Sequence, residues 1–171
     1  MVTETLELLQ CGPGQCVIDA TVGYGGHGFE ICKRLGESGL YVGLDQDEEA
    51  VESAWTVLRT FPCQVKILHG NFDQIDELVR EAGVEEADSV LFDLGVSSPQ
   101  LDSPERGFSF AEGPLDMRMS QSSPITAADF LASASQQEVR RGLQQYADEK
   151  KAKSIARTIV ETRKTEPIVQ P

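Results

Sequence analysis

The sequence predicts an α/β fold built on a parallel β-sheet with its strands in the order 3-2-1-4. Three observations support this. Four short apolar segments alternate with segments of helical periodicity, as in successive β-α-β units. Right-handed connections place the first strand between the second and the fourth. Acidic residues end the second and fourth segments, at the sheet edge where such folds bind ligands. The expected strands are 16–20, 40–44, 65–68 and 89–92.

The helices between the strands follow from apolar spacing and from their end signals. The expected helices of this part are 3–9, 28–35, 48–59 and 74–82. Gly36 is a typical residue for ending the second of them. We therefore assign residues 1–119 to a cofactor-binding core.

Beyond residue 119 the pattern is helical only. Ser135 and Glu138 have the spacing of a capping box, which predicts a helix that runs to about residue 146. A second helix is expected over about 149–164, with an apolar stripe along one side. We read residues 120–171 as a helical insertion after the fourth strand that recognises the substrate.

The composition of the chain limits the classes of function that it can have. The chain has 171 residues and a net charge of −13, with four cysteines that show neither CxxC pairing nor a histidine at metal-ligand spacing. We expect reduced thiols and no metal. No apolar stretch is long enough to cross a bilayer, and the N-terminus lacks the pattern of a signal peptide. These features predict a cytoplasmic protein (organellar if eukaryotic) without membrane contact.

The negative charge is unevenly distributed. Residues 1–90 contain 17 acidic and 5 basic side chains, whereas residues 140–164 contain 8 basic and 3 acidic ones. Because binding to phosphates requires Lys and Arg, a nucleic-acid surface is expected on the C-terminal segment. From charge alone, a solvated helix face is the favoured interpretation.

A glycine-rich turn follows the first strand. Gly23 to Gly28 reads GYGGHG, a GxGxxG pattern between a strand and a helix, and Asp45 ends the next strand. Glycines allow a ligand to approach the backbone, and the helix start attracts an anion. The pattern fits a nicotinamide dinucleotide or S-adenosylmethionine (SAM). The acidic start of the turn at Asp19, and Asp93 at the end of the fourth strand, favour SAM, whose sulfonium and ammonium groups tolerate carboxylates better than a pyrophosphate does.

A long segment, 93–119, follows the fourth strand without helical or strand periodicity. A loop of this length in a compact domain is usually functional or disordered. Its apolar residues argue against disorder; they are Phe108, Phe110, Leu115, Met117 and Met119. We expect the loop to fold over Asp93.

Several segments also resemble, in order, the motifs of one enzyme family. They are DATVGYGGHG at 19–28, GLDQD at 43–47, HGNF at 69–72, DLGVSSPQLD, ERGFSF and GPLDMRM within 93–119, and AKSIARTIVETR at 152–163. The chain resembles the bacterial-type small-subunit rRNA cytosine-N(4)-methyltransferases (the RsmH or MraW family) over nearly its whole length. The resemblance implies a Rossmann-like class I SAM-dependent methyltransferase fold.

The resemblance also implies a reaction and a set of cofactor contacts. Methyl transfer from SAM to the exocyclic N4 amine of a cytidine in small-subunit (16S) rRNA, near the decoding centre, is expected. The residues that match the family's SAM contacts are Gly25, Gly26, His27, Asp45, Phe72, Asp93 and Gln100. His27 is expected to bind without acid–base chemistry, and no catalytic residue is assigned.

The expected partner is the small ribosomal subunit; whether the protein forms a homodimer stays open. Arg106 and Arg118 are candidates to hold RNA, or equally to fix the loop through neighbouring carboxylates. The family's C-terminal motif is absent, so we expect an N-terminal portion of the family's protein, with weak or no turnover by residues 1–171 alone. The alternatives are an NAD-binding oxidoreductase and a truncated, non-catalytic rRNA-binding module.

Overall fold

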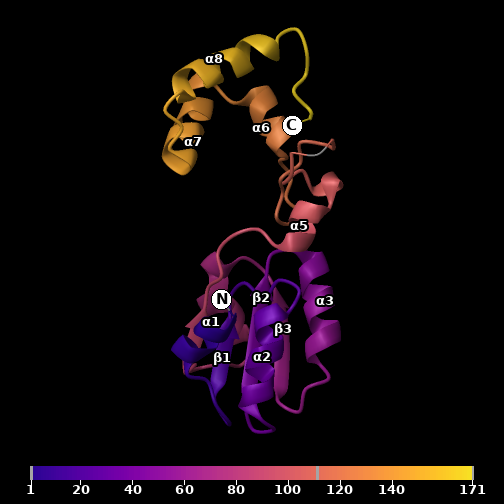
Figure 1. Ribbon diagram of the computed structural model, residues 1–171, viewed down its shortest axis with the longest axis vertical. Coiled ribbons are helices and arrows are strands. Elements are labelled where there is room, and N and C mark those ends of the chain that lie inside the picture. Colours follow the sequence, from indigo (N-terminus) through magenta and orange to yellow (C-terminus); the bar gives the residue numbers. More distant parts are fainter. Residues whose placement is uncertain (1, 111, 171) are drawn as a thin grey trace. The chain divides into compact units, whose positions relative to one another are not determined.

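The computed structural model describes residues 2–110 and 112–170 and shows an α/β protein (Figure 1). The chain divides into two compact units, Met1–Ser97 and Ser98–Pro171, which are described separately below. Among the helices of the described residues, none combines the length and apolar character needed to cross a membrane.

A four-stranded parallel sheet forms the centre of the first unit. The strands are β1 (Cys16–Asp19), β2 (Leu40–Asp45), β3 (Gln64–His69) and β4 (Ser89–Leu91), and they lie in the order β3-β2-β1-β4. The predicted fold class and strand order are therefore confirmed. β4 is an edge strand and ends one residue before the predicted Phe92.

The helices of the first unit cover both faces of this sheet. They are α1 (Val2–Leu9), α2 (Gly26–Leu35), α3 (Glu48–Leu58), the 3-10 helix η1 (Phe72–Gln74) and α4 (Ile75–Glu81). Asp47 fixes the start of α3, because its carboxylate accepts the backbone N–H of Glu49 at 3.2 Å. α2 begins at Gly26, two residues earlier than predicted.

Side-chain alternation along the strands divides the core into two clusters. Val17 and Tyr41 belong to one cluster, with Ile31 of α2 and Leu58 of α3. Their sequence neighbours, including Ile18, point to the opposite face and pack with residues of α4. Each fully buried aliphatic side chain contributes about 1.5–3 kcal/mol, so the two clusters hold the strand ends in fixed positions.

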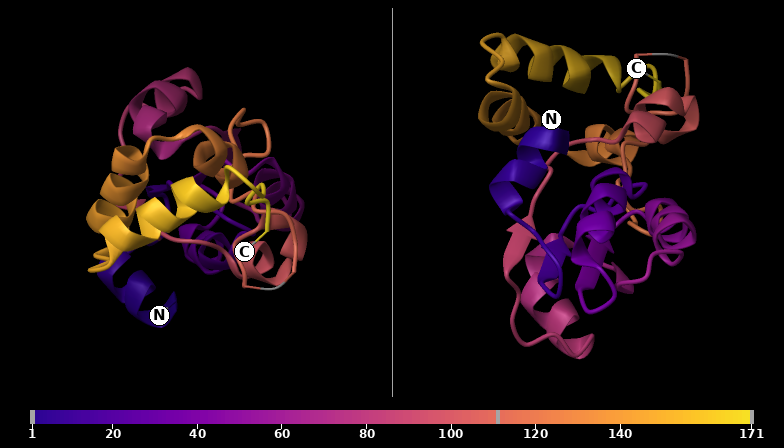
Figure 2. Two further views of the ribbon diagram at one scale, coloured as in Figure 1. Left: turned by 90° about the horizontal axis from the view of Figure 1, so that it is seen from above. Right: turned by 60° about the horizontal axis from the view of Figure 1, so that its bottom comes forward.

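The second unit is helical. Its elements are α5 (Ser98–Asp102), the 3-10 helix η2 (Pro104–Arg106), α6 (Ala127–Ser133), α7 (Gln136–Ala147) and α8 (Ala152–Thr162). α7 and α8 pack against each other (Figure 1 and Figure 2) around Val139 and Ala156. The predicted capping box of α7 is confirmed, because Ser135 and Glu138 exchange both of its hydrogen bonds.

Two features of the second unit differ from the prediction. The loop at 93–119 contains two short helices, α5 and η2, and α6 was not expected. The division between the units falls after Ser97, whereas we placed a boundary at 119. The reason is hydrogen bonding within the second unit, where Leu115 N–H donates to Val169 O at 2.8 Å and Ala127 N–H donates to Asp116 O at 2.7 Å. The assignment of residues 1–119 to cofactor binding stays a prediction.

Candidate cofactor-binding site

The glycine turn after β1 presents the start of α2. Gly25 caps this helix with φ of +86°, a left-handed conformation that favours glycine. No side chain caps α2 and its first turn contains no acidic residue. The first amides of a helix lack an intrahelical acceptor and carry a partial positive charge, so this end of α2 suits an anionic group.

Two glycines of α2 have opposite surroundings. A Cβ on Gly28 would lie 2.5 Å from Tyr41 Oη and 2.8 Å from Leu58 Cδ1, so Gly28 allows α2 to pack closely on β2 and α3. A Cβ on Gly26 would meet no atom within 4 Å beyond its chain neighbours and the backbone of its own helix. Gly26 therefore leaves open space beside the helix start.

Asp45 joins the end of β2 to the glycine turn. Its Oδ2 accepts the N–H of Gly23 at 2.9 Å, and its Oδ1 accepts the N–H of Asp47 at 3.0 Å. A carboxylate has about four acceptor sites, so the two backbone contacts leave capacity for ligand hydroxyls. The same side chain can therefore shape the turn and bind a ligand.

Asp93 and His27 lie beside each other at the ends of β4 and the glycine turn. The backbone N–H of Asp93 donates to Thr21 Oγ1 at 2.8 Å, which fixes the residue after β4. Its carboxylate is half exposed, and Oδ2 lies 3.6 Å from Nδ1 of His27. Nε2 of His27 is buried and has no hydrogen-bond partner among the described residues. Such a buried polar atom is expected to meet a ligand or water.

Aromatic rings lie at the ends of β3 and β4. Phe72 and Phe92 form an edge-to-face pair with centroids 5.9 Å apart, and both are partly exposed. Asn71 fixes the start of η1, because its side chain accepts the N–H of Asp73 at 3.2 Å. Phe72 was predicted from the sequence as a site residue, whereas Phe92 was predicted only as the end of a strand.

A buried polar pair lies beneath the turn. Tyr41 Oη donates to Asp19 Oδ2 at 2.9 Å, and the N–H of Thr21 donates to Asp19 Oδ1 at 3.1 Å. Burial raises the pKa of Asp19, and the Tyr41 hydrogen bond opposes this shift. Burial, followed by the charge of Asp19, raises the pKa of Tyr41 well above its ordinary value. Tyr41 was predicted only as part of the second strand, without a polar role.

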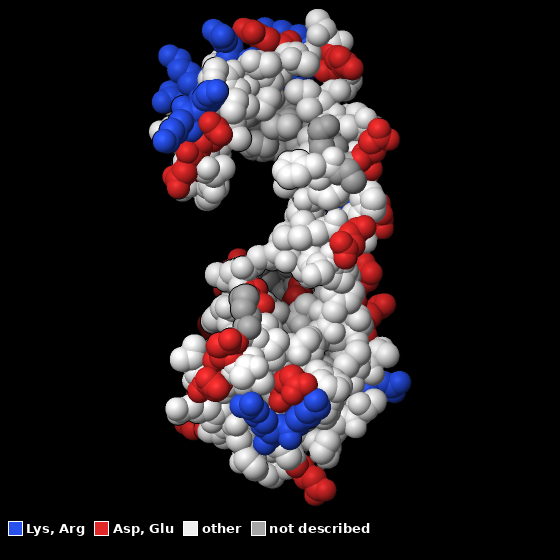
Figure 3. All heavy atoms as spheres, viewed as in Figure 1, with Lys and Arg blue, Asp and Glu red and all other residues white. Residues whose placement is uncertain are grey.

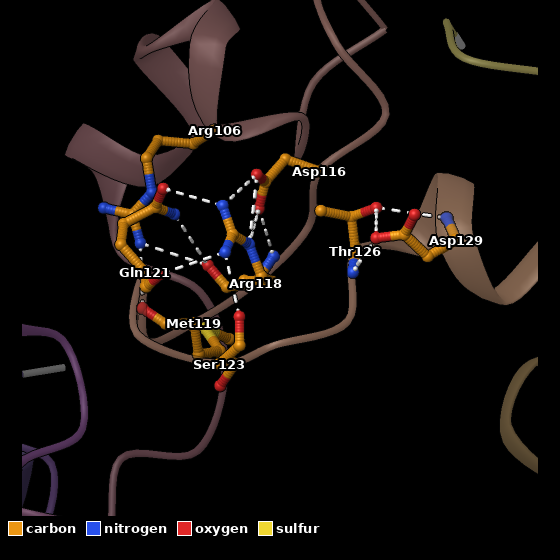
Figure 4. Close-up of polar contacts among 8 residues, drawn as sticks. All are labelled: Arg106, Asp116, Arg118, Met119, Gln121, Ser123, Thr126 and Asp129. Atoms are coloured by element: carbon orange, nitrogen blue, oxygen red, sulfur yellow. Dashed lines mark hydrogen bonds and ion pairs between the residues drawn. The ribbon is translucent and has the colours of Figure 1, made fainter.

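In the second unit, Arg106 and Arg118 fix the loop (Figure 4). Arg106 is buried and donates to the carbonyl oxygens of Arg118 and Met119, at 3.3 and 2.9 Å. Arg118 binds the carboxylate of Asp116 at 2.7 Å.

The guanidinium of Arg118 also reaches two carbonyl oxygens, those of Gln121 at 2.9 Å and Ser123 at 2.8 Å. The hydrogen bonds from Arg118 lower the pKa of Asp116. These contacts favour the structural alternative for both arginines over a role in holding RNA.

The structure thus places six of the seven predicted contacts at one edge of the first unit. They are Gly25, Gly26, His27, Asp45, Phe72 and Asp93. Gln100 lies on α5 in the second unit and is buried. The cofactor role of all seven stays a prediction. Among residues 2–110 and 112–170, no group of three or more His, Cys, Asp or Glu side chains is arranged to hold a metal ion.

A parallel sheet with a glycine turn and carboxylates at its strand ends is typical of the α/β proteins that bind nucleotide-containing cofactors. Residues 1–171 match the model of the MraW methylase family, and the chain belongs to this family. The resemblance seen in the sequence is thereby confirmed.

Curated relatives agree with this assignment. The chain is 44% identical over 170 residues to the "Ribosomal RNA small subunit methyltransferase H" of Syntrophotalea carbinolica, covering 99% of this chain and 54% of that protein. Proteins with the same name from Halothermothrix orenii and Methylococcus capsulatus are 40% and 43% identical, with 98% and 99% of this chain and 54% and 57% of those proteins covered. The chain spans about half the length of the curated relatives it matches.

Proposed function

We propose that this protein binds SAM at the carboxyl edge of its sheet and transfers the methyl group to the N4 amine of a cytidine in small-subunit rRNA, near the decoding centre. The observation that carries this proposal is the convergence of the glycine turn, Asp45 and Asp93 at three neighbouring strand ends. Membership of the MraW methylase family and the names of the relatives support it.

The residues present fit SAM. The uncapped start of α2 and the open space at Gly26 suit the methionine carboxylate. Asp45 has acceptor capacity for the ribose hydroxyls. Phe72 and Phe92 offer aromatic surface for the adenine. Gly25 and His27 complete the turn. Gln100 stays a predicted contact of the cofactor.

SAM would supply a methyl group carried on a sulfonium. The protein's task is to hold the amine in line with that group, because positioning is a main source of rate enhancement. The half-exposed carboxylate of Asp93 matches the positive charge of the cofactor. It is also an acceptor for an amine hydrogen, which would stabilise the charge that develops. We assign Asp93 to binding and leave the catalytic residue unassigned.

The acceptor assignment is tested in the source organism. After deletion of the full-length gene, we expect mass spectrometry of small-subunit rRNA nucleosides to show the loss of an N4 methyl group from one cytidine. A plasmid copy should restore the modification, and the same copy with Asp45→Ala should not. Unchanged N4-methylcytidine after deletion would contradict the proposal.

The small ribosomal subunit is the proposed partner and the cytoplasm the proposed compartment.

A further inference from the structure

We propose that the exposed cations of α7, α8 and the turn between them form the surface that binds the RNA backbone. This inference rests on the proposed function and adds the RNA contact to it. The residues of this α7–α8 surface are Arg140, Arg141, Lys150, Lys151, Lys153, Arg157 and Lys164. Figure 3 shows Lys and Arg side chains gathered over these helices.

The cations of the α7–α8 surface are not held in ion pairs with carboxylates. Within the described part of the chain, none of its seven cations forms an ion pair, and Arg141 Nε donates only to the amide oxygen of Gln145, at 3.3 Å. Cations without carboxylate partners bind phosphates with release of the counterions that surround RNA. The same number of cations locked in ion pairs would contribute far less.

The outer face of α7 is also hollowed. A hollow of about 370 Å³ is lined by side chains that recur at helical spacing; they are Gln137, Arg140, Arg141, Gln144 and Gln145. Guanidinium and amide groups donate hydrogen bonds to phosphate and sugar oxygens. Among the residues that the structure describes, no carboxylate or apolar side chain lines the hollow. Its chemistry therefore matches a nucleic-acid backbone.

The helix presents these groups on a fixed support. Val139 is buried on the other side of α7 and packs with Ala156 of α8. The capping box of Ser135 and Glu138 fixes the start of α7. Because Val139 on the apolar side of α7 is buried within the second unit, it is not available for insertion into a lipid surface. This favours RNA over an anionic membrane.

The charge of the rest of the chain also indicates that RNA binds at the α7–α8 surface. Residues 1–97 contain 18 acidic and 5 basic side chains, which repel a polyanion, whereas residues 140–164 contain 8 basic and 3 acidic ones. A protein with a net charge of −13 requires a local positive field to bind RNA. The α7–α8 surface supplies that field.

The test compares three double variants of the 171-residue chain that change the net charge equally. Arg140→Gln with Arg141→Gln removes two cations at the hollow, and Lys153→Gln with Arg157→Gln removes two on α8. The control is Arg59→Gln with Arg80→Gln, which removes two exposed cations of the first unit. Binding to small-subunit rRNA transcribed in vitro is measured by filter retention over a range of salt concentrations.

We expect both α7–α8 variants to bind rRNA about tenfold more weakly than the wild type. The slope of log binding constant against log salt concentration should be shallower by about 1.4, since each lost single-strand phosphate contact removes about 0.7. The control should match the wild type in affinity and in this salt slope. If both α7–α8 variants keep wild-type affinity and slope while the wild type binds rRNA, the surface assignment is wrong and the proposed function stands. If the wild type binds vesicles of anionic lipid but no rRNA, the proposal of an RNA substrate falls as well.

Discussion

Replacing Asp45 by alanine is expected to weaken SAM binding about a hundredfold. The substitution removes the proposed acceptor for the ribose hydroxyls, and hydrogen bonds to a charged group contribute about 1.5–3 kcal/mol each. It also removes the acceptor of the Gly23 and Asp47 backbone N–H groups, so the turn that holds the cofactor loses its anchor. Isothermal titration with SAM measures the effect.

Two further variants separate binding from general loss of structure. Asp45→Asn keeps one amide oxygen and should show an intermediate loss of affinity. Asp76→Ala removes an exposed carboxylate on α4 and should bind SAM as the wild type does. Wild-type affinity in Asp45→Ala would refute the ribose assignment.

Replacing Tyr41 by phenylalanine is expected to lower the free energy of unfolding by about 3 kcal/mol at neutral pH. The variant loses the hydroxyl that donates to Asp19 at 2.9 Å, and the Asp19 carboxylate is fully buried. A buried charged group that loses its partner destabilises more than a neutral one. Urea unfolding measures the change, and Tyr146→Phe, at an exposed tyrosine, should be nearly neutral.

The deficit of Tyr41→Phe should depend on pH with a defined sign. Burial raises the pKa of Asp19 in the folded state above its ordinary value of 3.8, and the Tyr41 hydrogen bond lowers it. Without that bond the folded-state pKa rises further. A raised carboxyl pKa destabilises the fold above that pKa, and the loss disappears as pH falls toward the unfolded-state value. The deficit should therefore shrink on acidification; a constant deficit would exclude Asp19 as its origin.

Local patterns in the sequence were enough to predict the sheet and the acidic residues at its strand ends. Strand periodicity and right-handed connections predicted the order β3-β2-β1-β4, and the acids at strand ends identified Asp45 and Asp93. The capping box at Ser135 likewise depends only on neighbouring residues. These features could be predicted because each is encoded within a few residues.

The features that were missed depend on contacts between distant residues or on weaker signals. Asp19 and Tyr41 are 22 positions apart, and only the pairing of β1 with β2 brings them together. The start of α6 was overlooked because Thr126 is followed at the third position by Asp129 instead of the usual Glu or Gln, although both bonds of the capping box form. The loop joins the second unit through backbone bonds such as Leu115 to Val169, which have no sequence pattern.

The most direct test of the central claim is SAM titration of Gly26→Ala beside Gly142→Ala. Neither new Cβ would meet an atom within 4 Å beyond its chain neighbours and the backbone of its own helix. Gly142 lies inside α7, so its replacement should stabilise the protein by roughly 0.5–1 kcal/mol and leave SAM affinity unchanged. Gly26→Ala should keep wild-type stability yet bind SAM at least about tenfold more weakly, because the new methyl group occupies the proposed ligand space. A tenfold loss of affinity corresponds to only ~1.4 kcal/mol of binding free energy. Equal SAM affinity in the two variants, or a wild type that binds NAD and no SAM, would contradict a methyl donor at this sheet edge.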